Sequence, residues 1–197
     1  MLERVASLLD KSLLRQTEQE GEEPRFAMLE TIREYGLEVL ASSGEAEAMH
    51  QAHAAYWLAL AEQAEPQLTS SQQLTWFERL ELEHDNLRAA LSWFLEQGAD
   101  EQRSEFSLRL SGALSQFWEI RGYVDEGRHW LERVLEISRG MKSSARAKAL
   151  TGAGGLATLQ GDFNLAEERC EEGLTLYQEL GDHQGSANCL SFLDMRP

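Results

Sequence analysis

The chain of 197 residues has little of what a sheet-rich, secreted or membrane protein needs. Three prolines and a scarcity of alternating Val, Ile and Thr argue against a protein built on sheets, and abundant Ala, Leu, Glu, Gln and Arg favour helices. The two cysteines, Cys170 and Cys189, are too few for a disulfide framework. No apolar run approaches the roughly 20 residues that span a bilayer, and the N-terminus lacks the apolar stretch of a signal peptide. We therefore expect a mostly helical protein of the cytoplasm without membrane contact.

Basic residues are also scarce. The chain has 18 Lys and Arg against 34 Asp and Glu, which gives a formal net charge of -16. Such a chain repels phosphate backbones, because nucleic-acid binding relies on cations that release counterions. We therefore expect no direct nucleic-acid binding. The acidic excess is interpreted first as a solvated surface and second as a field that favours basic partners.

Motifs for catalysis, cofactors and metals are missing as well. The chain has no Gly-x-x-x-x-Gly-Lys-Ser/Thr loop and hence no cradle for nucleotide phosphates. The segment GAGG at 152–155 lacks the preceding strand that a dinucleotide site requires. His50 and His53 have a spacing that suits metal ligands, but too few partners converge with them. His84 and Asp85 have no Ser or Cys nucleophile nearby in the sequence. We expect no enzyme activity, no cofactor and no metal.

The first 44 residues have the sequence pattern of a helix, a β-hairpin and a second helix. Apolar residues of 2–9 share one helical face. Two short apolar runs then flank the polar segment EQEGEEP at 18–24, which predicts a β-hairpin with that segment at its tip. A second helical stripe begins at Leu29 and stops at Gly44. Since helix, hairpin and helix form the latter part of a winged-helix arrangement, residues 1–44 are predicted to be a partial winged helix.

Residues 45–100 are predicted to form a helical linker hairpin. A first helical stripe breaks at Pro66. Ser70 and Gln73 have the spacing of a capping box ahead of a second helix, predicted over 74–98. Its apolar stripe repeats every three or four residues and consists of Phe77, Leu80, His84, Leu87, Leu91 and Phe94. His84 is therefore interpreted as a core residue.

Residues 101–197 contain an internal repeat. At an offset of 39 residues, Gly122, Gly127, Leu131 and Val134 recur as Gly161, Ala166, Cys170 and Gly173. Two helices joined at a Gly turn, with a small residue where they cross, are typical of a helical-hairpin solenoid. The Gly-Asp pair at 161–162 is predicted to be the turn within a hairpin, and the pair at 181–182 the turn between hairpins. The last repeat is predicted to be truncated.

Residues 147–180 resemble one tetratricopeptide repeat. The matching positions are Leu150, Gly154 and Ala157 in its first helix, Gly161 and Phe163 at its turn, and Ala166, Cys170 and Gly173 in its second helix. The chain departs from the pattern at Leu150 and Ala157, where large aromatic residues are usual, and at Gln178, where Pro is usual. The resemblance implies a tetratricopeptide-like solenoid over 101–197.

Four further stretches resemble a larger family in fixed order: LDKSLLRQ, RFAMLETIREYGLEVL, HAAYWLALAE and WFERLELEHDNLRAAL. They are similar to the segment that follows the nucleotide-binding module in bacterial signal-transduction ATPases of the LuxR/AfsR-like group, including maltose-regulator-like proteins. The resemblance implies ATP binding and transcriptional control for a complete protein. Because the phosphate loop and a basic C-terminal helix-turn-helix are missing from this sequence, it is interpreted as a middle segment of such a regulator.

The leading hypothesis is a non-enzymatic sensor and scaffold segment. Stacked hairpins form a concave groove lined by their first helices, which suits a protein, a peptide or a small inducer. The expected groove residues are Arg109, Gln116, Glu119, Lys148, Thr151 and Thr158. The last helix carries more apolar surface than one packed face can hide, which predicts a homodimer through Leu190, Phe192 and Leu193.

Two alternatives remain open. One is a purely structural oligomerisation unit. The other is a DNA-contacting winged helix, which requires a cluster on one face of Arg4, Lys11, Arg15, Arg25 and Arg33. Residues 1–50 hold eleven acids against five bases. In the resembled family this element usually packs against the ATPase module, so a packing role is favoured.

We predict that the purified chain does not retain duplex DNA at physiological salt, because its net charge of -16 opposes the approach of phosphates. Fluorescence anisotropy of a labelled duplex measures this, and a flat titration is expected. Saturable retention that disappears in Arg25→Ala and Arg33→Ala would instead favour the winged-helix alternative.

Overall fold

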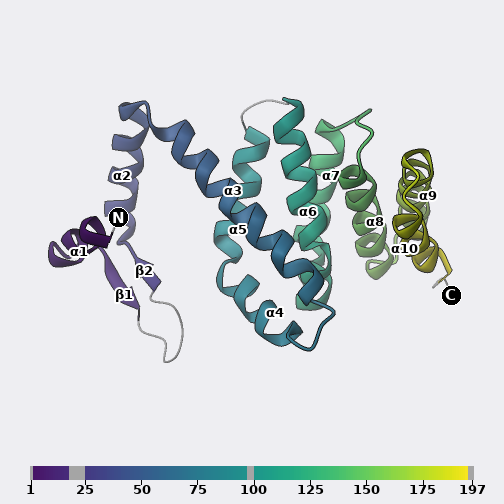
Figure 1. The fold of residues 1–197 in the computed structure, drawn as a ribbon, viewed down its shortest axis with the longest axis horizontal. Helices are drawn as coiled ribbons and strands as arrows, with labels where there is room; N and C mark the ends of the chain where they lie inside the picture. The colour runs from purple at the N-terminus through teal and green to yellow at the C-terminus, as the bar shows by residue number, and fades with distance from the viewer. Residues whose placement is uncertain (1, 18–24, 97–99, 195–197) are drawn as a thin grey trace. The chain divides into compact units, whose positions relative to one another are not determined.

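The computed structural model describes residues 2–17, 25–96 and 100–194 (Figure 1). The chain divides into two compact units, Met1–Met49 and His50–Pro197, called unit 1 and unit 2 below. Most of the described residues are helical, as the composition predicts, and the sheet found among them has two strands. The predicted boundary after residue 44 falls within unit 1, and the one after residue 100 falls within unit 2. As functional boundaries, both stay predictions.

Unit 1 contains the predicted helix, hairpin and helix. Its elements are α1 (Leu2–Asp10), β1 (Arg15–Thr17), β2 (Arg25–Ala27) and α2 (Glu30–Ser43). The strands are antiparallel with Gln16 opposite Phe26, which confirms the hairpin, while its predicted tip at 18–24 lies outside the described residues. α2 ends at Gly44 in the left-handed conformation (φ 76°), as predicted. No residue of α2 is buried, so its apolar stripe lacks a core to cover it.

Unit 2 begins within α3 (Ala46–Ala64) and continues through η1 (Glu65–Gln67), α4 (Gln73–Leu82) and α5 (His84–Glu96). The single helix predicted over 74–98 is wrong, because the chain turns at Glu83 (φ -99°, ψ 6°). The predicted stripe from Phe77 to Phe94 is nevertheless buried on both sides of the turn, since α4 and α5 both pack against α6. The capping box is absent too. The Ser70 hydroxyl accepts a hydrogen bond from the Gln72 amide, and α4 begins without a side-chain cap.

Glycine turns separate the helices of the repeat region. The helices are α6 (Glu101–Arg121), α7 (Val124–Ile137), α8 (Ser144–Leu159), α9 (Phe163–Leu180) and α10 (His183–Asp194). Gly122, Gly161 and Gly181 follow α6, α8 and α9 with φ of 79°, 75° and 70°, a conformation that residues with a Cβ rarely adopt. The Gly-Asp turn within the pair α8–α9 and the one between α9 and α10 are both confirmed.

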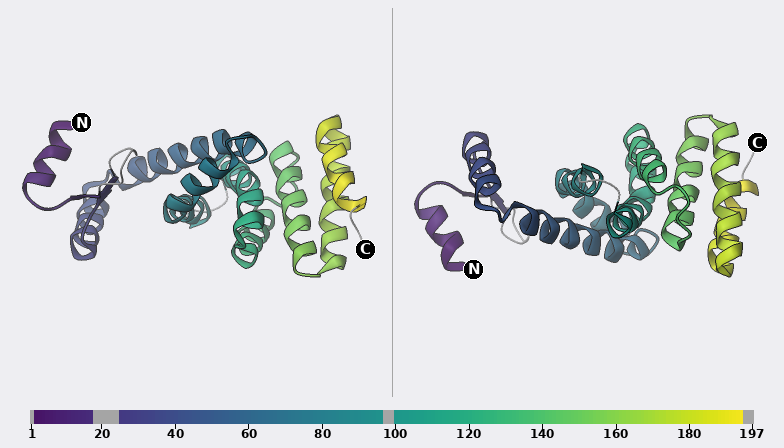
Figure 2. Two further views of the ribbon diagram at one scale, coloured as in Figure 1. Left: turned by 90° about the horizontal axis from the view of Figure 1, so that it is seen from below. Right: turned by 90° about the horizontal axis from the view of Figure 1, so that it is seen from above.

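Consecutive helices of this region lie next to one another along unit 2 (Figures 1 and 2). α8 contacts α6, α7, α9 and α10. Small residues occupy the crossings. A Cβ added at Gly127 would lie 2.7 Å from Trp118 and from Leu156, and one added at Gly154 would lie 2.5 Å from the Cys170 sulfur. Since a close-packed interior leaves no room for such atoms, these glycines allow the close approach of the helices.

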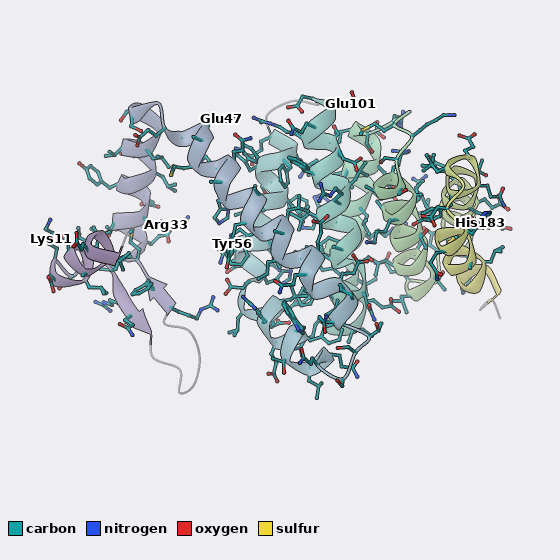
Figure 3. All side chains as sticks on the ribbon, viewed as in Figure 1. Lys11, Arg33, Glu47, Tyr56, Glu101 and His183 are labelled. Carbon is teal, nitrogen blue, oxygen red and sulfur yellow. The ribbon has the colours of Figure 1, made fainter. Side chains whose placement is uncertain are left out.

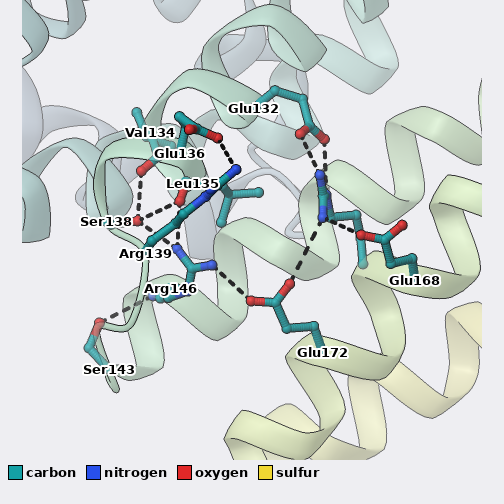
Figure 4. Close-up of polar contacts among 11 residues, drawn as sticks. Glu132, Val134, Leu135, Glu136, Ser138, Arg139, Ser143, Arg146, Glu168 and Glu172 are labelled. Carbon is teal, nitrogen blue, oxygen red and sulfur yellow. Dashed lines mark hydrogen bonds and ion pairs between the residues drawn. The ribbon is translucent and has the colours of Figure 1, made fainter.

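Ion pairs join the second helices of consecutive pairs. Arg88 of α5 donates two hydrogen bonds to the Glu126 carboxylate of α7, at 2.8 and 2.5 Å. Arg169 of α9 donates two to Glu132 of α7, at 3.1 and 2.7 Å (Figure 4). Both are bidentate pairs, which are stronger and more directional than single contacts.

Arg146 ties α8 to the helices on either side (Figure 4). Its guanidinium is buried and donates to the Leu135 carbonyl oxygen, to the Ser138 hydroxyl and to the Glu172 carboxylate, each at 2.8 Å. The Ser138 hydroxyl also donates to the Val134 carbonyl oxygen, so Arg146 completes a buried polar cluster at the end of α7.

We predict that Gly127→Ala lowers the free energy of unfolding by about 1–3 kcal/mol, because overpacking against Trp118 outweighs the roughly 1 kcal/mol gained in helix propensity. Urea denaturation followed by circular dichroism measures the change. Gly112→Ala is the matched control, since the atoms nearest its added methyl group would be those of the flexible Lys148 side chain, at 3.1 and 3.3 Å, followed by the Ala149 amide nitrogen at 3.7 Å. A loss for Gly112→Ala as large as that for Gly127→Ala would contradict this account of the crossings.

Candidate functional site

A groove of about 480 Å³ opens in unit 2 where several helices converge. Most of its wall comes from α6, α8 and α10, and the rest comes from the end of α3, from η1, from Tyr177 of α9 and from Asp182 in the turn before α10. Its lining residues are Glu62, Glu65, Glu105, Arg109, Ser144, Ala145, Lys148, Tyr177, Asp182, Gln184 and Gly185. The groove therefore joins residues more than a hundred positions apart in the sequence.

Both cations of the lining are engaged in ion pairs. Arg109 of α6 donates to the two Glu62 carboxylate oxygens at 2.7 and 2.8 Å, and this hydrogen bonding raises the pKa of Arg109. The Lys148 ammonium of α8 lies 2.5 Å from the Glu65 carboxylate. These pairs hold α6 and α8 to the segment that ends α3 and forms η1.

The other two carboxylates of the lining have different surroundings. Asp182 precedes α10 and accepts a hydrogen bond from the Gly185 amide at 2.9 Å, as a helix cap does. Glu105 of α6 is partly exposed, but its Oε2 atom is buried and has no hydrogen-bond partner among the described residues. The lining thus holds four carboxylates and two cations, and both cations are already paired.

Tyr177 of α9 supplies an aromatic wall. Burial, together with the nearby Cys189 and Asp182, raises the pKa of Tyr177 to about 12, so the phenol stays protonated at neutral pH. A Cβ added at Gly185 would lie 2.3 Å from the Tyr177 ring. The glycine therefore lets the start of α10 lie directly on this ring.

Two of the six expected groove residues, Arg109 and Lys148, line the groove. Gln116 and Glu119 lie farther along α6 and are half-buried, and burial raises the pKa of Glu119. Thr158 is exposed near the end of α8, where its hydroxyl donates to the Gly154 carbonyl oxygen. None of these three is part of the lining.

Thr151 requires a correction. It is buried, not open to the groove, because α10 covers this part of α8. Its hydroxyl lies 3.0 Å from the Ala147 carbonyl oxygen and 2.9 Å from the Cys189 sulfur. Helical spacing places a residue on a face but does not reveal which later helix packs on that face.

The groove also contains residues that the sequence interpretation missed, above all Glu62, Glu65, Glu105 and Tyr177. Two signals pointed toward them. Pro66 marks the end of the helix that carries Glu62, and the Gly-Asp turn at 181–182 marks the start of α10. Neither feature of the sequence indicates that the end of α3 and the start of α10 line the same groove.

The residues predicted for self-association and for DNA contact are only partly described. Leu190 is exposed, whereas the side chains of Phe192 and Leu193 lie outside the described residues. Lys11 lies just after α1, and Arg33 on α2 pairs with Glu30 at 2.7 Å (Figure 3). Arg15 is exposed, Arg25 is partly exposed, and the side chain of Arg4 lies outside the described residues. Both hypotheses stay predictions.

His84 is a core residue, as predicted. Its ring packs against Phe117 and Tyr123, and its Nε2 atom lies 3.1 Å from a Glu126 oxygen without the alignment of a hydrogen bond. Burial lowers the pKa of His84. Across the part of the chain that the structure describes, no three His, Cys, Asp or Glu side chains are placed to share a metal ion, and no helix has the length and apolar character to cross a bilayer.

Comparison with known proteins finds relatives among bacterial regulators. Over 163 residues, 80% of its length, the chain is 36% identical to proteins provisionally named HTH-type transcriptional regulators in Mycobacterium tuberculosis and Mycobacterium bovis. The chain spans 18% of the length of these relatives. No family model and no solved structure matches it significantly. The similarity supports the transcriptional-regulator part of the resemblance and does not distinguish the LuxR/AfsR-like group within it.

The pair of Arg109 with Glu62 generates a prediction. Arg109→Glu would place two carboxylates against each other, so we expect the free energy of unfolding to fall by about 1 kcal/mol. The double variant Glu62→Arg/Arg109→Glu should recover most of this loss in urea denaturation. Arg139→Glu, which breaks an exposed pair with Glu136, serves as the control with a smaller effect. No recovery in the double variant would contradict a stabilising role for the pair.

Proposed function

We propose that this chain is the ligand-sensing segment of a transcriptional regulator and that its ligand binds in the groove of unit 2. The similarity to proteins named as regulators supports the biological setting. The observation that carries the proposal is the groove itself, since its volume of about 480 Å³ falls within the range of roughly 300–1,000 Å³ usual for small-molecule sites. The segment acts by binding and transmission, without catalysis or a cofactor.

We further propose that unit 2 is a tetratricopeptide-like solenoid of the LuxR/AfsR-like kind. Helix pairs that recur at an offset of 39 residues, with glycines after their first helices at Gly122 and Gly161, support a tetratricopeptide-like solenoid. Such a solenoid occurs in the LuxR/AfsR-like regulators that the sequence resembles. In that setting the complete protein would carry an ATPase module and a DNA-binding domain elsewhere in its chain.

The position of the groove suits a sensor. Its wall includes residues of α6, α8 and α10, which are the first helices of consecutive helix pairs, and of the end of α3. A ligand that contacts several of these helices stabilises the arrangement in which all of its contacts with them can form at once. Binding can therefore shift the relative positions of the hairpins, which is the change that a neighbouring regulatory module would detect.

We predict that Ser144→Trp abolishes ligand binding, because Ser144 is exposed at the start of α8 and an indole there would fill the groove. The measurement is the shift of the Lys148 and Gly185 backbone amide signals in NMR titrations with a panel of amino-acid amides, monosaccharides and nucleosides. At least one class should give saturable shifts in the unchanged chain. Stability should change by no more than about 0.5 kcal/mol, as is usual for exposed substitutions.

Thr175→Trp is the control for the size of the new side chain, since Thr175 is exposed on α9 and does not line the groove. It should bind the panel as the unchanged chain does. The proposal fails if no compound shifts the groove amides, or if the shifts persist in Ser144→Trp.

A further inference from the structure

The sign of the charge in the groove restricts the ligands that it can take. Four carboxylates and two cations line it, and the whole chain carries a formal net charge of -16. The two cations are not available, because Arg109 and Lys148 are held by Glu62 and Glu65. Within the described part of the chain, no cation lies at ion-pair distance from the other two carboxylates of the lining, those of Glu105 and Asp182.

Glu105 shows the clearest need for a partner. Its Oε2 atom is shielded from water and has no hydrogen-bond donor among the described residues. A buried acceptor without a donor is unfavourable, and more so when the group is charged. Arg109, one helical turn farther along α6, does not satisfy this atom, because its guanidinium donates to Glu62 instead. A donor entering the groove would relieve this cost once the Glu105 side chain turned toward it.

Asp182 also lines the groove and directly precedes α10. Its Oδ1 atom is used by the Gly185 amide, and a carboxylate can accept further hydrogen bonds at its second oxygen. The lining also includes the Tyr177 side chain and the small residues Ala145 and Gly185. An aliphatic chain can lie against such a surface while its charged end meets a carboxylate.

An anionic ligand would face the reverse situation. It would have to displace Glu62 from Arg109 or Glu65 from Lys148, and the displaced carboxylate would remain in the same groove. The field of the remaining carboxylates would also oppose it. The loss of an ion pair and the repulsion by the remaining carboxylates both favour a cation over an anion.

We propose that the groove binds a positively charged group, an ammonium or a guanidinium, held by Glu105 and Asp182 with its aliphatic part against Tyr177. The inference rests on the proposed function and names the chemical class of its ligand. The cation can belong to a small molecule or to a Lys or Arg side chain of a short peptide, because both present the same group.

NMR titration of the full chain with acetyl-arginine amide tests the charge directly, with acetyl-citrulline amide as the neutral probe of nearly equal shape. The arginine probe should shift the Ala145, Lys148 and Gly185 amides saturably, and the citrulline probe should bind at least about fivefold more weakly, as expected for loss of a partly exposed ion pair. The peptide acetyl-Ala-Arg-Ala-amide distinguishes the sources. Binding clearly tighter than that of the single residue assigns the cation to a peptide, and equal binding assigns it to a small ligand.

Charge-neutral variants identify the carboxylates. Glu105→Gln and Asp182→Asn keep the shape of each side chain, and Asn can still cap α10. Each should weaken the arginine probe about three- to fivefold. Glu78→Gln and Glu171→Gln are exposed controls outside the lining that change the net charge equally, and they should leave binding unchanged.

Three results would overturn the inference: equal binding of both probes, tighter binding of acetyl-glutamate amide, or no groove shift with the arginine probe. In the first two cases, loss of the shifts in Ser144→Trp would leave the groove as a ligand site and reject only the cation. In the third case, shifts from another compound of the panel would do the same.

Discussion

The close crossing of helices at small residues is the constraint on which the rest of unit 2 depends. Gly127 lies against Trp118 and Leu156, and Gly154 lies against Cys170, at distances that exclude a Cβ. Because the helices approach this closely, the arginine and glutamate side chains of neighbouring helices are within reach of each other. Arg146 can then bond to the end of α7 and to α9 at once. A larger residue at a crossing would disturb the packing and these polar contacts together.

The stacking also separates two kinds of polar surface. The second helices carry bidentate pairs such as Arg88 with Glu126 and Arg169 with Glu132, which join α5, α7 and α9. The first helices instead meet around the groove, where Arg109 and Lys148 pair with carboxylates at the end of α3 and in η1. The first set of pairs therefore joins α5, α7 and α9, and the second set joins α6 and α8 to the end of α3 and to η1 beside a groove lined by acids.

Local patterns predicted the helical content, the small hairpin and the glycine turns, because local chemistry determines these elements. The turns at Gly161 and Gly181 and the hairpin of unit 1 followed from glycine and from apolar spacing. The break at Glu83 did not, since the apolar stripe keeps its helical period across the turn. The groove was predicted only at Arg109 and Lys148. Thr151 was misplaced because its burial depends on α10, and Glu62 and Tyr177 were missed because their meeting depends on long-range packing that no local spacing records.

Hydrogen–deuterium exchange of the full chain, with and without acetyl-arginine amide, tests most directly whether stacked first helices form a cation-binding groove. We predict slower exchange in the first turns of α8 and α10 and in the half of α6 that contains Glu105 and Arg109. Unit 1 and α7 should be unaffected. Unchanged exchange in α6, α8 and α10, or protection confined to unit 1 or α7, would contradict this prediction.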